Sequence, residues 1–232
     1  MLPFPRSTGE IFGKPRPTFA GLLAFGAFAT AGCSVGSGTV GPPPPPAIIV
    51  SVSPLTGTVL LGNTLPFTAM VTNTTDTAVS WSVNGIAGGS SSLGTISATG
   101  SYTAPSDLPS PASAQITATS QADHTKSSTA TVSIISDITL SLAPNPANVE
   151  LGATQAFQAT LTSAGHPDTA MRWTLSGSSC PTACGTVDSS GRFTAPGILP
   201  SPSGVTLTAQ SVADPSKQIS AAVTLQAILR YS

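Results

Sequence analysis

The chain has 232 residues, of which only 7% are charged, and its formal net charge is −1. A protein that binds nucleic acid electrostatically needs a basic patch, and this composition supplies none, so we predict no nucleic-acid partner. Hydrophobic residues make up 40% of the chain, too many for a disordered protein, and their alternation with Thr and Ser, punctuated by 22 Gly and 22 Pro, predicts an all-β fold.

An export signal is predicted at the N-terminus. Basic residues precede an apolar stretch of 13 residues, from Phe19 to Ala31. This stretch matches the core of a secretory signal peptide and is shorter than the ~18 residues that span a bilayer. The alternative is a buried helix of the folded domain, which is disfavoured because the Gly- and Pro-rich segment that follows offers no helix to pack against.

Two cleavage sites compete at the end of this stretch. Thr30-Ala31-Gly32-Cys33 resembles a bacterial lipobox, in which small residues precede a cysteine that receives diacylglycerol, although Thr30 stands where Leu is usual. An ordinary secretory cut after Ala31 also follows the small-x-small rule. Lipidation explains why an exported chain keeps a third cysteine besides two that can pair. We therefore predict a lipoprotein signal peptide over 1–32 and a lipid on Cys33, which makes the membrane a partner.

Residues 33–47 are predicted to form a tether. Ser, Gly and Val give a flexible spacer, and the run Pro42–Pro46 favours polyproline II. Ser34 follows the cysteine at the position where an Asp commonly retains lipoproteins at the inner membrane. The lipobox resemblance therefore implies the outer membrane or cell surface, and a chain without the lipid is expected to be secreted.

The remainder of the chain consists of two similar copies of one sequence pattern. Shifted by about 90 residues, 50–72 aligns with 140–162. We predict two domains, 48–136 and 137–228, each with about seven short strands, which is the pattern of an immunoglobulin-like Greek-key β-sandwich. The expected aromatic core residues match between the copies: Trp81 and Trp173, Phe67 and Phe157, Tyr102 and Phe193.

The repeated motifs resemble a known family. The order V-x-P, L-G-x-T-x-x-F-x-A, W-x-V, G-T-I-x-x-x-G-x-Y-T-A-P and I-T-A-T-S is similar to that of tandem bacterial immunoglobulin-like modules of the BIG2 kind, over residues 48–226. The resemblance implies the fold rather than a specific activity. This chain departs from the family pattern by inserting SDLPSPAS, and in the second copy GILPSPSG, after Thr-Ala-Pro.

The insertion belongs to a repeated loop with conspicuous glycines. Gly94 and Gly100, and their counterparts Gly185 and Gly191, are expected to make tight turns with positive φ. Pro105 should end a strand, and the prolines after it should stiffen a crossover to the next one. We interpret the repetition as structural, because each sandwich has to make the same crossover. The alternative is a loop that binds a ligand on a rigid scaffold.

The polar candidates point to structure rather than chemistry. His124 has a proline as its counterpart, and His166, two residues before Asp168, accompanies no G-x-S-x-G motif. Asp123 and Asp214 recur in a hairpin turn, where we expect each carboxylate to accept hydrogen bonds from nearby backbone amides. The acids form no D-x-D-x-D calcium loop. We therefore predict no enzyme, no cofactor and no metal.

Cys180 and Cys184 are predicted to form a local disulfide. A zinc site needs two more ligands, and the C-x-x-x-C spacing differs from the C-x-x-C of redox-active pairs. The predicted function is that of a non-enzymatic, lipid-anchored spacer or adhesive module of the cell envelope. The alternative is a receptor that binds a cell-surface glycan or protein through the Pro-rich loops.

Overall fold

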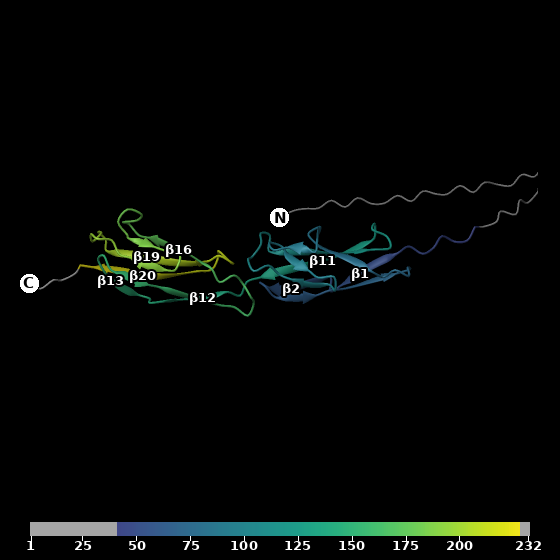
Figure 1. The fold of residues 1–232 in the computed structure, drawn as a ribbon, viewed down its shortest axis with the longest axis horizontal. Coiled ribbons are helices and arrows are strands. Elements are labelled where there is room, and N and C mark those ends of the chain that lie inside the picture. Colours follow the sequence, from purple (N-terminus) through teal and green to yellow (C-terminus); the bar gives the residue numbers. More distant parts are fainter. Residues whose placement is uncertain (1–40, 228–232) are drawn as a thin grey trace, which may run out of the picture. The chain divides into compact units, whose positions relative to one another are not determined.

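The computed structural model describes residues 41–227, so the predicted signal peptide, Cys33 and most of the tether lie outside the described residues. The all-β prediction is confirmed, because the regular elements of this range are strands (Figure 1). Within the same range, no helix is long and apolar enough to cross a bilayer. The described residues from Pro45 to Ala227 belong to one compact unit.

The first copy folds as a two-layered sandwich. Its strands are β1 Ile49–Ser53, β2 Thr56–Leu60, β3 Thr64–Pro66, β4 Thr68–Thr72, β5 Val79–Val83, β6 Ile86–Ala87, β7 Gly89–Ser90, β8 Gly94–Ile96, β9 Ser101–Thr103, β10 Ser113–Ser120 and β11 Ser127–Ile135. One layer has the order β2-β11-β10-β5-β6, and the other combines β1-β4 with β3-β9-β8-β7. The prediction of about seven strands is wrong in number. Pro54 and Phe67 each interrupt a strand, and two short edge strands were not foreseen: β6, which pairs with β5, and β7, which pairs with β8 in the other layer.

The second copy repeats this arrangement without counterparts of β6 and β7. Its strands are β12 Thr139–Ala143, β13 Ala147–Glu150, β14 Thr154–Ala156, β15 Gln158–Thr162, β16 Met171–Ser176, β17 Thr186–Val187, β18 Arg192–Thr194, β19 Gly204–Ser211 and β20 Gln218–Gln226. In both copies the first strand is divided between layers: β1 and β12 pair antiparallel with β4 and β15, whereas β2 and β13 pair parallel with β11 and β20. This division and the connections that cross between layers give immunoglobulin-like sandwiches.

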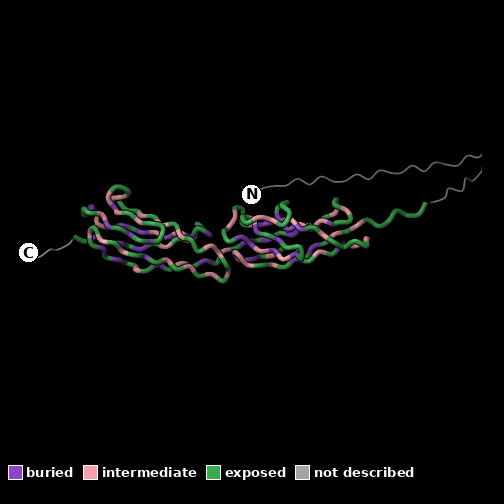
Figure 2. The backbone as a smooth tube through the Cα atoms, viewed as in Figure 1, coloured by how far each residue is buried: buried purple, intermediate pink, exposed green. Residues whose placement is uncertain are grey.

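Each sandwich has its own hydrophobic core, built by residues that alternate along the strands (Figure 2). Trp81 lies opposite Ala118 and Trp173 opposite Ala209, so that a large side chain meets a small one at the same register in both copies. In the first copy the core aromatic residues Phe67, Trp81 and Tyr102 are buried. In the second copy Phe157 and Phe193 are also buried. Trp173 is only half-buried, and its strand β16 has no edge neighbour equivalent to β6.

The repeated glycines make the turns that the sequence predicts. Gly100 has φ +83° and Gly191 has φ +81°. A Cβ atom at Gly100 would lie 2.3 Å from the carbonyl oxygen of Phe67, and one at Gly191 would lie 2.5 Å from that of Phe157. Both turns thus require glycine for its backbone conformation and for the close approach to a core strand. The chain then leaves β9, or β18, and crosses to the opposite layer.

Candidate interaction site at the Pro-rich loops

The two crossovers, here called the first loop (105–112) and the second loop (196–203), are anchored in the same way. The amide of Gly62 donates a 3.0 Å hydrogen bond to the carbonyl of Pro105, and the amide of Gly152 donates a 3.1 Å bond to that of Pro196. At the other end, the amides of Ile134 and Leu225 donate 3.0 Å bonds to the last part of each loop. The loops are therefore equivalent in how each sandwich holds them.

The first loop is bound by the second copy. The amide of Leu108 donates a 2.7 Å hydrogen bond to the carbonyl of Ala213, and the carbonyl of Ser106 accepts a 3.1 Å bond from the amide of Asp168. Ala213 is 1% exposed and belongs to the hydrophobic core of the first sandwich, which Leu108 also contacts. The loop thus serves as a joint between the copies rather than as a free surface.

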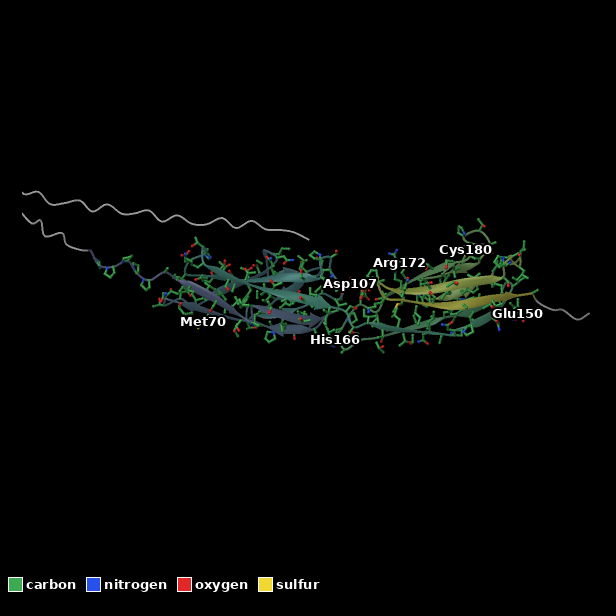
Figure 3. All side chains as sticks on the ribbon, turned by 180° about the vertical axis from the view of Figure 1, so that it is seen from behind. Met70, Asp107, Glu150, His166, Arg172 and Cys180 are labelled. Carbon is green, nitrogen blue, oxygen red and sulfur yellow. A yellow bond between two sulfur atoms is a disulfide. The ribbon has the colours of Figure 1, made fainter. Side chains whose placement is uncertain are left out.

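Further contacts complete the joint. The amide of His166 donates a 2.7 Å bond to the carbonyl of Leu61, and its Nδ1 lies 2.7 Å from Oδ1 of Asn63. Ile138, in the short connection between the copies, is 2% exposed and packs into the first core. Figure 3 labels Asp107 of the first loop and His166 of the segment that contacts it. Backbone hydrogen bonds and buried apolar side chains therefore both hold the two copies together.

The second loop has no such cover among the described residues. Ile198 is 82% exposed and Leu199, the counterpart of Leu108, is 44% exposed. Leu151 is half-buried, whereas its counterpart Leu61 in the first copy is 1% exposed. The first loop contacts the second copy, whereas the equivalent second loop presents an apolar surface to solvent. We regard this surface of the second loop as the candidate interaction site.

His166 and Asp168 do not form a catalytic pair. The ring of His166 contacts Asn63, and the Oδ1 atom of Asp168 instead accepts a 2.9 Å bond from the amide of Ala170 in its own turn. The structure uses both side chains in the turn and the joint.

The predicted turn role of Asp123 and Asp214 is confirmed. Oδ1 of Asp123 accepts a 2.9 Å bond from the Thr125 amide, and Oδ1 of Asp214 accepts a 3.0 Å bond from the Ser216 amide. Hydrogen bonds from Thr125 hold the pKa of Asp123 below its ordinary value. Burial by itself would raise the pKa of Asp214, but hydrogen bonds from Ser216 and Ser136 and the nearby charge of Lys217 together outweigh it, so that the pKa is lowered.

The two described cysteines form a disulfide. Cys180 and Cys184 are joined with their Cα atoms 5.0 Å apart, on a loop that Figure 3 shows projecting from the second sandwich. Cys184 is 2% exposed and packs into the second core. Across residues 41–227, no group of three or more His, Cys, Asp or Glu side chains is placed to hold a metal ion.

Shallow cavities flank both tryptophans. The cavity beside Trp81 has a volume of about 250 Å³ and walls from Phe67, Val79 and Thr99. The one beside Trp173 has a volume of about 390 Å³, and charged residues, Arg172 and Asp188, contribute to its walls. Equivalent positions thus differ in chemistry, which gives no reason to assign the two cavities a common ligand.

Sequence reasoning missed the joint because its partners are mostly backbone groups. Ser106, Ala213 and Leu61 contribute carbonyl oxygens, which any residue type provides. The available signal was a contrast between the copies: the second copy carries His166 in a two-residue insertion, and Asn63 is replaced by Ala153.

Comparisons with known proteins find only distant similarities, to solved structures. No family model matches the sequence, and no curated protein matches it. Sidekick-1 immunoglobulin domains 1–4 are 18% identical with a TM-score of 0.33, over 78% of this chain and 49% of that one. The surface layer protein SbsC, domains 1–6, is 15% identical with a TM-score of 0.33, over 79% of this chain and 28% of that one. The human mucin-like protocadherin EC1-2 is 14% identical with a TM-score of 0.32, over 77% and 98%. The fold assignment therefore depends on the strand pairing described above.

Proposed function

We propose that this chain is a lipid-anchored, non-catalytic protein of the cell envelope, with two BIG2-like modules that serve as a spacer at the outer membrane or cell surface. The joint between the sandwiches is the observation that carries the proposal. A spacer has to keep its modules in a defined relation, and here hydrogen bonds from Leu108, Asp168 and His166 accompany buried apolar contacts across the joint. The His166 side chain takes part in this joint, and the Asp123 side chain in a hairpin turn.

The anchor is argued from the sequence. Cys33 follows Thr-Ala-Gly as in a lipobox, and residues 33–47 provide a stalk rich in Gly and Pro. A diacylglyceryl thioether together with an N-acyl chain gives firm attachment, whereas a single acyl chain binds a membrane only marginally.

Metabolic labelling with a fatty acid tests the anchor. We expect the wild-type chain to take up label and to sediment with membranes, and the Cys33→Ala variant to lose both properties. A Cys180→Ala, Cys184→Ala double variant is the matched control, since it removes the other two cysteines and should keep the label. Absence of label from the wild type would instead make this a freely secreted protein.

A receptor function is the second candidate, and the exposed second loop favours it. Ile198 and Leu199 present apolar surface on a loop that the sandwich holds at both ends. Glycan arrays and pull-downs from cell walls, run with wild type and Leu199→Asp, distinguish the two functions. Binding that the substitution abolishes supports a receptor, whereas a surface phenotype of module deletion without any binding supports a spacer.

A further inference from the structure

We propose that the second loop docks on the outer end of the first sandwich of another copy of this chain. Two chains would then repeat, between molecules, the joint that the first loop makes within one molecule. The inference goes beyond the spacer function and does not depend on the lipid anchor.

The argument begins with the loop side of the joint. The first and second loops have the same length and the same anchoring bonds, from Gly62 to Pro105 and from Gly152 to Pro196. Leu199 occupies the position of Leu108, the residue whose amide binds the second copy. A loop of this structure therefore already binds an immunoglobulin-like module in this protein, and its repeat exposes the equivalent leucine.

The receiving side is also present twice. In the second copy, the joint uses the turn at Asp168 and the carbonyl of Ala213. The first copy has the same two features: the Asp76 carboxylate accepts a bond from its own turn, as Asp168 does, and Ala122 occupies the position of Ala213.

Exposure separates the two receiving sides. Ala213 is 1% exposed and half-buried Asp168 lies in the joint, whereas both Ala122 and Asp76 are exposed. The outer end of the first sandwich thus offers, uncovered, the surface that the first loop recognises in the second sandwich. A contact between two different surfaces of one molecule is heterologous, so that it extends head to tail into a row of chains when it does not close into a ring.

The joint between chains is expected to be weaker than the one within a chain. The pair formed by His166 and Asn63 has no counterpart, because the first copy lacks the insertion and Ala153 replaces Asn63. The linker within a chain also supplies an effective concentration on the order of millimolar, which separate chains lack. Association should therefore appear as the protein concentration approaches about 1 mM.

Sedimentation velocity on residues 41–232, which contain both hydrophobic cores, tests the proposal. We expect the weight-average sedimentation coefficient of the wild type to rise with concentration, and Leu199→Asp to need at least about tenfold more protein for the same rise, because a charge would enter an apolar contact. The control is Leu55→Asn, which replaces a leucine that is 63% exposed elsewhere by the residue of the other copy, Asn145. Leu55→Asn should associate as the wild type does. No association up to about 1 mM, or equal association of Leu199→Asp, overturns the proposal.

Cysteine cross-linking tests the head-to-tail geometry. One chain carries Leu199→Cys and the other Ala122→Cys, and the intramolecular pair Leu108→Cys with Ala213→Cys reports how readily this geometry oxidises. We expect the mixture to give at least about fivefold more mixed dimer than either chain gives homodimer. A Leu199→Cys homodimer as abundant as the mixed dimer would show that second loops meet each other, and the head-to-tail arrangement would be wrong.

Discussion

The hydroxyl of Tyr102 donates a 2.8 Å hydrogen bond to the backbone carbonyl of Leu93, and the second copy has Phe193 and Cys184 at these two positions. Tyr102 is fully buried, so the bond fixes the chain just before the turn at Gly94. Phe193 has no hydroxyl to donate, and in that copy the same segment is tied by the disulfide of Cys184. The two sandwiches thus hold equivalent segments by different means.

Replacing Tyr102 tests the contribution of its hydrogen bond to Leu93. We expect Tyr102→Phe to lower the free energy of unfolding of the first sandwich by about 1 kcal/mol, the net contribution of a typical hydrogen bond. Hydrogen exchange at the amides of β9, compared with those of β18, measures the change in each copy separately. Loss of protection in β18 would contradict the assignment, because Phe193 already lacks this bond.

The same residue predicts a dependence on alkaline pH. Burial raises the pKa of Tyr102 from 10.0 to about 12, because the charged phenolate is disfavoured in the core. The folded state therefore favours the neutral phenol, and this contribution to stability is complete below pH 10 and is lost as the pH rises from 10 to 12. We expect the urea midpoint of the first sandwich to fall over this window. A Tyr102→Phe variant should lose that part of the fall, and an unchanged decline in the variant would refute the cause.

The disulfide is expected to stabilise only the sandwich that contains it. A Cys180→Ala, Cys184→Ala double variant should lower the unfolding free energy of the second sandwich by about 2 kcal/mol, since a bond that closes so small a loop removes little entropy from the unfolded chain. Calorimetry of the variant, and of the wild type under a reducing thiol, gives the measurement. A shift in the transition of the first sandwich of comparable size would disagree with the local role.

The features that could be predicted from the sequence are those that depend on hydrophobic periodicity and on the residues of tight turns. The repeat, the two-layered sandwiches, the positive φ at Gly100 and Gly191 and the turns at Asp123 and Asp214 all follow from local patterns. Each is specified by the residue itself or by close neighbours in the chain, and an internal repeat displays the pattern twice.

The features that escaped prediction depend on contacts between distant segments. Whether a loop is a joint or a free surface is decided by what covers it, and Ser106 meets Asp168 through backbone atoms alone. The strands β6 and β7 were not predicted because they are only two residues each. Trp173 was expected in the core like Trp81, yet it is only half-buried.

The glycine of the core turn should be intolerant of substitution in either copy. Gly100→Ala and Gly191→Ala each impose a positive φ on alanine, which costs about 1–2 kcal/mol, and add a steric clash with the strand carbonyl. We expect each variant to destabilise its own sandwich by at least about 2 kcal/mol in urea titrations. Gly204→Ala is the control, because nothing lies within 4 Å of its added Cβ. A loss in the control as large as that in Gly100→Ala would show that the turn geometry is not the cause.

The joint between the sandwiches can be opened by one methyl group. Gly62 has φ +69° and a Cβ there would lie 2.3 Å from the carbonyl oxygen of His166, whereas its counterpart Gly152 has φ +72° and nothing within 4 Å of an added Cβ. Gly62→Ala and Gly152→Ala therefore carry the same backbone strain, and only the first clashes across the joint. We expect NMR relaxation to give the two sandwiches one common rotational correlation time in wild type and in Gly152→Ala, and separate, shorter times in Gly62→Ala. Equal correlation times in the two variants would mean that the backbone contacts of His166 and Leu61 do not couple the sandwiches, and the spacer function would lose its structural support.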